Sequence, residues 1–126
     1  MFLHPDRHFS THELQASKRL GAWREMISDV FYSVDIDVDR TNQDGWLASI
    51  SEVKVQNLGI SLYVTDSARG TRNRPAISTD GEEYYIFVFP VIGTMYFNQY
   101  GRDGVVNPGQ YVMLKSSDFY KLSCVT

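Results

Sequence analysis

The chain of 126 residues has little of what a secreted or membrane protein needs. Its one cysteine, Cys124, has no partner within the chain, so no internal disulfide and no oxidising compartment are implied. The longest apolar run, Ile86 to Ile92, is far too short to span a membrane. The first residues turn polar within a few positions and do not form the apolar part of a secretory signal. We therefore expect a cytoplasmic location and no membrane partner.

Histidine is also scarce, since the chain has three, at positions 4, 8 and 12, and none after His12. Metal sites in small barrels are built from imidazole and carboxylate groups that strands bring together. Glu82 and Glu83 are neighbours in the chain, and neighbours on a strand point to opposite faces. The sequence therefore predicts no metal centre and no cofactor.

Nucleophiles paired with a base, and dense basic patches, are also lacking in the sequence. Cys124 has no histidine within sequence reach, and Ser116 and Ser117 lack a base. The net charge is −3, and a protein that grips phosphates usually concentrates positive charge on one face. The densest basic stretch holds three arginines, Arg69, Arg72 and Arg74. We expect neither catalysis nor direct nucleic-acid contact by this chain.

The hydrophobic residues that are present follow first a helical and then a strand spacing. Residues 1–9 show no period and are expected to be poorly ordered. Ser10 and Glu13 have the spacing of a capping box and open a predicted helix of roughly 15–20 residues. The apolar stripe of this helix consists of Leu14, Leu20, Trp23, Ile27, Val30 and Phe31.

From Val34 onward, alternating side chains and turn residues predict strands. The predicted strands cover residues 34–38, 46–55, 58–65, 84–91, 94–99, 110–114 and 119–125. Residues 66–83 are polar and predict a long connection, and Gly101 to Gly104, which contains an Asp103-Gly104 signal, predicts a hairpin turn. The fold class is therefore mainly β, a barrel or sandwich of about six to eight strands preceded by an N-terminal helix. Residues 10–126 form the predicted domain.

An aromatic group of residues is the candidate binding site. Tyr85, Phe87 and Phe89 share one face of a predicted strand, and Phe97 lies on the next. Small-molecule pockets are mostly apolar with a few polar anchors, and barrel mouths are a usual place for them. Arg72, on the preceding connection, could anchor a carboxylate. The alternative is that these aromatic side chains only form a core.

Several short motifs follow one another in a recognisable order. They are the segments 9–11 and 19–25, Arg72, Asp80, Tyr84-Tyr85, Gly93-Thr94, Gln99, Gly101-Arg102 and Pro108-Gly109. In order and spacing they resemble the effector-binding domain that precedes the helix-turn-helix pair of AraC/XylS-type transcription regulators. The likeness spans nearly the whole chain, although residues 72–75 and 116–120 depart from the family's pattern.

The resemblance implies a cupin-like jelly-roll barrel that binds a small organic effector without a metal. It also implies transcription regulation through a separate DNA-binding domain, which is absent here and would follow Thr126. Because such regulators often act in pairs, we expect a homodimer. Its interface is predicted either at the helix stripe of Leu20, Trp23, Ile27 and Phe31 or at a strand edge near Val125.

The sequence thus predicts a sensing domain whose effector contacts a set of five residues. These are Arg72, Tyr85, Phe87, Phe89 and Phe97. Two alternatives stay open. One is a small cupin-type enzyme, an isomerase or dioxygenase, which needs a metal or a paired acid and base. The other is a dimerisation module whose barrel is filled by its own side chains.

Overall fold

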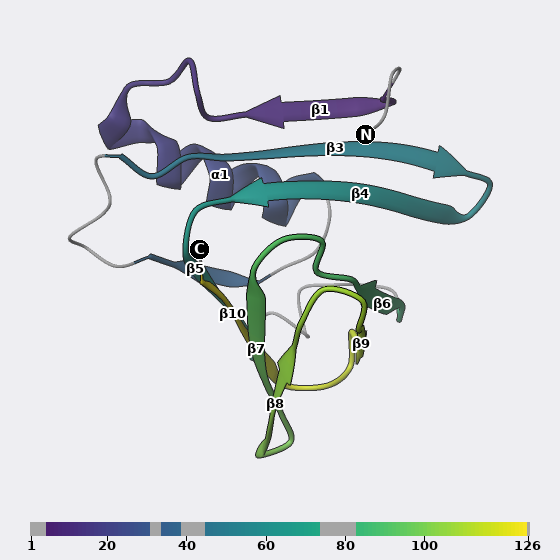
Figure 1. Ribbon diagram of the computed structural model, residues 1–126. Coiled ribbons are helices and arrows are strands. Elements are labelled where there is room, and N and C mark those ends of the chain that lie inside the picture. Colours follow the sequence, from purple (N-terminus) through teal and green to yellow (C-terminus); the bar gives the residue numbers. More distant parts are fainter. Residues whose placement is uncertain (1–4, 31–33, 39–44, 74–82, 126) are drawn as a thin grey trace.

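The computed structural model describes residues 5–30, 34–38, 45–73 and 83–125. In these ranges the chain forms one helix and ten strands, so the predicted mainly β fold with a helix is confirmed (Figure 1). Several residues that the sequence predictions used lie outside the described ranges: His4, Phe31, Arg74, Asp80, Glu82 and Thr126.

The first sheet is antiparallel and has the order β1-β3-β4. Its strands are β1 (Arg7–Ser10), β3 (Ala48–Val55) and β4 (Leu58–Thr65), and helix α1 (Ala16–Val30) runs alongside β3 and β4 (Figure 1). The ring centroid of Trp23 on α1 lies 6.1 Å from those of Phe9 on β1 and Tyr63 on β4. One face of this sheet is therefore covered by the helix.

Two further sheets are built from the rest of the chain. The larger one has the order β2-β5-β10-β7-β8, and the smaller one pairs β6 with β9. Their strands are β2 (Asp35–Asp37), β5 (Ala68–Arg72), β6 (Tyr85–Val88), β7 (Thr94–Gln99), β8 (Arg102–Val106), β9 (Val112–Lys115) and β10 (Tyr120–Val125).

Two hydrophobic clusters fill the interior. The first lies under α1 and contains Trp23, Ile27, Ile36, Val38, Trp46, Ala48 and Ile50. The second joins the larger sheet to β6 and β9, and contains Met95, Val106, Val112, Leu114 and Tyr120. Since only 3% of Trp23 and 2% of Ile27 are exposed, the centre of the helix stripe is used by the domain's own core.

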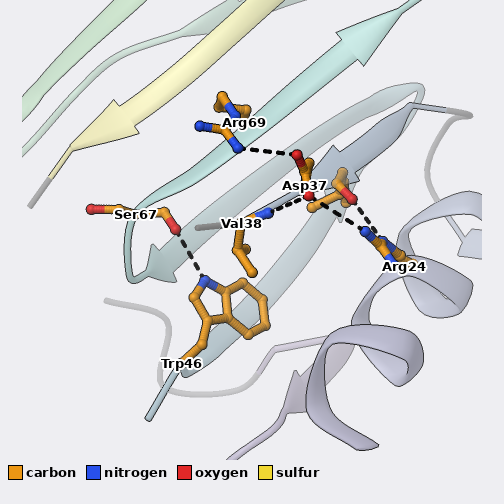
Figure 2. A network of polar contacts seen from close by, with 7 residues as sticks. Arg24, Asp37, Val38, Trp46, Ser67 and Arg69 are labelled. Carbon is orange, nitrogen blue, oxygen red and sulfur yellow. Dashed lines mark hydrogen bonds and ion pairs between the residues drawn. The ribbon is translucent and has the colours of Figure 1, made fainter. Parts of the chain in front are cut away.

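A polar network connects α1, β2 and β5 (Figure 2). Arg69 Nη2 donates to Asp37 Oδ2 over 3.0 Å, and Arg24 Nε donates to the carbonyl oxygen of Ile36 over 2.6 Å. The hydrogen bond from Arg69 lowers the pKa of the Asp37 carboxyl below its ordinary value. Nearby, Trp46 Nε1 donates to the carbonyl of Ser67 over 3.2 Å, which anchors the large ring beside the start of β5.

The N-terminal prediction is wrong in two respects. Residues 7–9 belong to strand β1, because they pair with β3. The helix begins at Ala16 and not at the Ser10–Glu13 capping box. The Ser10 hydroxyl instead accepts a hydrogen bond from His12 N, and buried Thr11 extends the pairing with β3 through bonds to Ala48.

Two predictions in the second half are also wrong. The predicted connection 66–83 contains β5, which pairs with β2 on one side and β10 on the other. The hairpin turn is at Tyr100-Gly101, so Gly101 is the one residue of the predicted turn 101–104 that belongs to it, and Asp103-Gly104 lie within β8. Tyr100 and Gly101 have φ values of 54° and 74°, as the two central residues of a type I′ turn require.

Candidate functional site

An open cleft of about 520 Å³ lies at the end of the larger sheet, within the size range of small-molecule sites. Three segments meet there: the end of β5, the β7–β8 turn and the start of β10. The cleft is lined by Thr71, Arg72, Asn73, Asn98, Tyr100, Gly101, Phe119, Tyr120 and Lys121. The register of β10 brings these segments together, because Tyr120 pairs with both Arg72 and Gln99.

A row of three polar side chains crosses the sheet at the cleft. Lys121 is the register partner of Thr71 on β5 and of Asn98 on β7. Register partners on neighbouring strands point to the same face, so the three side chains lie side by side. Asn98 Nδ2 also donates to Asp103 Oδ1 over 2.7 Å, which fixes the orientation of its amide. The row presents an exposed ammonium group next to a hydroxyl and an amide.

Arg72 is the buried cation of the site. Only 1% of the residue is exposed, and its Nε donates to the carbonyl oxygen of Ser116 over 2.9 Å. Its guanidinium carbon lies 5.9 Å from the centroid of the Tyr84 ring. Arg72 is the register partner of Tyr120, next to Lys121 on β10, so its side chain points to the other face of the sheet and borders the cleft from the buried side.

Two exposed rings complete the lining, Tyr100 at 67% and Phe119 at 46% exposure. The Tyr100 hydroxyl donates to Asp118 Oδ1, and Gln99 Nε2 donates to Asp118 Oδ2 over 3.1 Å. The hydrogen bond to Asp118 raises the pKa of the Tyr100 phenol above its ordinary value. Asp118 thereby fixes the Tyr100 side chain, which holds one of the two rings in place.

The arrangement suits recognition of a small molecule that has both a flat ring and a negative charge. Among the described residues, the lining contains cations, amides, hydroxyls and aromatic rings but no carboxylate, and the carboxylates of Asp103 and Asp118 next to it accept hydrogen bonds from Asn98 and Tyr100. An exposed ammonium group such as that of Lys121 binds carboxylates through charge-assisted hydrogen bonds, and aromatic rings stack on flat ligands. Elsewhere in the described ranges, no group of three His, Cys, Asp or Glu residues lies close enough together to hold a metal ion.

The structure separates the five residues that the sequence grouped as ligand contacts. Arg72 lines the cleft, but it lies buried in β5 and not in a loop. Phe97 packs against the second hydrophobic cluster. Tyr85 and Phe87 are exposed by 58% and 53%, on the opposite face of β6 from Ile86 and Val88, which pack against that cluster. Phe89, which follows β6, is exposed by 62%. A direct role of these three aromatic residues in effector binding stays a prediction.

Sequence reasoning missed Asn98, Tyr100, Phe119 and Lys121 as possible ligand contacts. The strands that carry Asn98 and Lys121 were predicted, but the cleft also depends on the turn at Tyr100 and on β5, whose polar sequence gave no strand signal.

The exposed aromatic residues Phe87 and Phe89 do not line the cleft, and both rings lie near that of Tyr111. The Tyr111 ring centroid lies 6.0 Å from that of Phe87 and 5.3 Å from that of Phe89.

Comparisons with known proteins agree with this fold. No protein-family profile matches the chain. It is 25% identical over 112 residues to an uncharacterized protein in the nit 5′ region of Bacillus sp. (strain OxB-1), which covers 89% of this chain and 43% of that protein. Among solved structures, the AraC-like transcriptional activator CuxR superposes with a TM-score of 0.76 at 18% identity, over 94% of this chain and 44% of that one.

The structural neighbour is therefore an AraC-like activator, and the likeness at this level of identity shows a shared fold. The chain spans less than half the length of both relatives. In the described ranges, the helix of this chain is not long and apolar enough to cross a membrane.

Proposed function

We propose that this chain is the effector-sensing domain of a transcription regulator of the AraC/XylS type. The fold is shared with an AraC-like activator over 94% of the chain. The observation that carries the proposal is the cleft in which the Lys121 row meets the rings of Tyr100 and Phe119. The effector it fits best is a small planar organic anion, such as an aromatic carboxylate.

In this proposal the effector acts by stabilising one conformation of the domain over another. The cleft is assembled from three segments far apart in the chain: the end of β5, the β7–β8 turn and the start of β10. A molecule that contacts all three favours the conformation in which they lie together. The DNA-binding domain that reads this conformation belongs to the longer regulator, which works in the cytoplasm and acts as a dimer.

Calorimetric titration with matched pairs of ligands tests the proposal. Aromatic carboxylates should bind, and their neutral amides should bind at least about tenfold more weakly, because a charge-assisted hydrogen bond is lost. Lys121→Ala should weaken carboxylate binding by a similar factor. Lys54→Ala is the matched control, since Lys54 is an exposed lysine on β3 and does not line the cleft.

Two results would overturn the proposal. One is the absence of any binding across a broad panel of aromatic and aliphatic carboxylates. The other is binding that Lys121→Ala and Lys54→Ala leave equally intact, which would place the ligand elsewhere. The enzyme alternative has its own test, which is the metal content of the purified protein. Stoichiometric iron, manganese or zinc would favour an enzyme.

A further inference from the structure

The row of polar side chains at the cleft continues by one strand, onto β2. Asp35 on β2 is the register partner of Thr71, which in turn is the register partner of Lys121. Register partners on neighbouring strands point to the same face of a sheet. The Asp35 carboxylate therefore lies on the same face as the Lys121 ammonium, with the Thr71 hydroxyl between them. The lining of the cleft ends at Thr71, so Asp35 lies just beyond its edge.

Asp35 differs from the other two carboxylates on this face of the sheet. Asp37, two residues further along β2, accepts a hydrogen bond from its register partner Arg69 (Figure 2). Asp103, at the opposite end of the row, accepts a hydrogen bond from Asn98. Asp35 is exposed, and among the described residues no side-chain hydrogen bond or ion pair holds its carboxylate. Its charge is therefore available to a cation from outside the domain.

The Lys121 ammonium is available in the same way to an anion. Lys121 is exposed, and within the described part of the chain no carboxylate lies within ion-pair distance of it. Strand β5 separates β2 from β10, and neighbouring strands lie about 4.8 Å apart, so the two backbones are about 10 Å apart. The row thus presents a negative and a positive group to solvent, separated by two strand spacings.

This pair of charges restricts which ligands the cleft accepts. A ligand that carries only negative charge is attracted by Lys121 but repelled by the nearby Asp35 carboxylate. A ligand with a cation at its far end replaces that repulsion by attraction, because an ammonium donates charge-assisted hydrogen bonds to a carboxylate. Selectivity is a difference between two affinities, so Asp35 favours the second kind of ligand through both effects.

We propose that the effector of this cleft is a zwitterion, an aromatic ring with a carboxylate at one end and an alkylammonium group at the other. The inference rests on the proposed function, since it keeps the carboxylate at Lys121 and assigns the opposite end of the same ligand. Asp35 binds the ammonium group and is the residue that determines this specificity. The rings of Tyr100 and Phe119, which line the cleft, stack on the aromatic part.

Calorimetric titration with two matched benzoates tests the inference. para-(Aminomethyl)benzoate carries an amine that is protonated at neutral pH, whereas para-(hydroxymethyl)benzoate has the same ring and carboxylate with a neutral group instead. Wild type should bind the zwitterion about threefold to fivefold more tightly, as expected for an exposed ion pair. Asp35→Asn should abolish this preference and leave the affinity for the hydroxymethyl compound unchanged. Glu13→Gln is the matched control, since Glu13 is exposed, does not line the cleft and loses the same single charge.

A charge reversal gives a second measurement that a folding defect cannot imitate. Terephthalate carries a carboxylate at both ends of the ring. Asp35→Lys should bind terephthalate more tightly than para-(aminomethyl)benzoate, whereas wild type should show the opposite order. A variant that folds poorly would lose affinity for both compounds and would not exchange their order.

The outcomes separate this inference from the proposed function. Equal binding of the two benzoates by wild type would overturn the inference, and so would a preference that Asp35→Asn retains. If both compounds nonetheless bind and Lys121→Ala weakens both, the proposed function stands without the zwitterion. If neither compound binds, the inference fails, and the broader panel of carboxylates decides whether the proposed function fails with it.

Discussion

Gly104→Ala is a sharp test of how the second hydrophobic cluster is packed. Gly104 on β8 is the register partner of Phe97 on β7, and the Phe97 ring lies directly over the glycine. A Cβ atom at position 104 would lie 2.2 Å from Phe97 Cζ and 2.3 Å from Cε1. Carbon atoms pack best at about 3.5 Å or more, so the ring must move by more than about 1 Å.

The expected cost follows from where the ring is held. Phe97 packs against the cluster that contains Met95 and Val106, so its ring has little free space into which to move. Inserting a methyl group into such packing costs about 1–3 kcal/mol. For a domain of this length the melting temperature should fall by roughly 3–15 °C. The backbone itself gives no reason for a loss, because the φ value of Gly104 is not positive.

Thermal unfolding followed by circular dichroism measures this effect, and Phe97→Leu supplies the double-mutant cycle. Leucine lacks the outer ring atoms that the new methyl group meets. Phe97→Leu should therefore cost less in the Gly104→Ala background than alone, by about 1 kcal/mol. A Gly104→Ala variant as stable as wild type, or strictly additive effects in the cycle, would refute the proposed ring-over-glycine packing.

Two further predictions concern the first core and the cleft. Trp23→Ala should destabilise the domain by about 3–5 kcal/mol without changing its oligomeric state, since the ring is buried against Trp46. Sedimentation measures the oligomeric state, and calorimetry measures the melting temperature. Dissociation of a dimer without a loss in melting temperature would contradict the prediction. Asp118→Asn should lower the pKa of the Tyr100 phenol toward the ordinary tyrosine value, because the raised pKa depends first on the hydrogen bond to the Asp118 carboxylate. Tyrosine-resolved NMR titration measures it, and an unchanged titration of Tyr100 would refute the role of Asp118.

Patterns within a short stretch determined several strands directly. The predicted ranges 58–65 and 94–99 have the same bounds as β4 and β7. Alternation around Ile36 likewise predicted β2, where the buried side chain lies between two exposed aspartates. These predictions succeed because side chains alternate between the two faces of any strand, and that period is local.

Tertiary pairing decided the strands whose own sequence has no such pattern. Arg7–Ser10 and Ala68–Arg72 are largely polar, and each becomes a strand because distant partners satisfy its backbone groups. The hairpin turn moved for a similar reason. Gly104 is needed inside β8 beneath the Phe97 ring, while Gly101 with its positive φ forms the turn.

The class of fold was thus predictable from the sequence, whereas the composition of the cleft was not. Local alternation shows that Tyr85, Phe87 and Phe89 share a face, but not whether that face points inward. The second cluster packs against Ile86 and Val88, which leaves the three aromatic residues exposed. Likewise, Arg72 and Lys121 share a cleft only because β10 pairs with β5. Local spacing fixes which side chains go together, while burial and proximity depend on strands that are distant in the sequence.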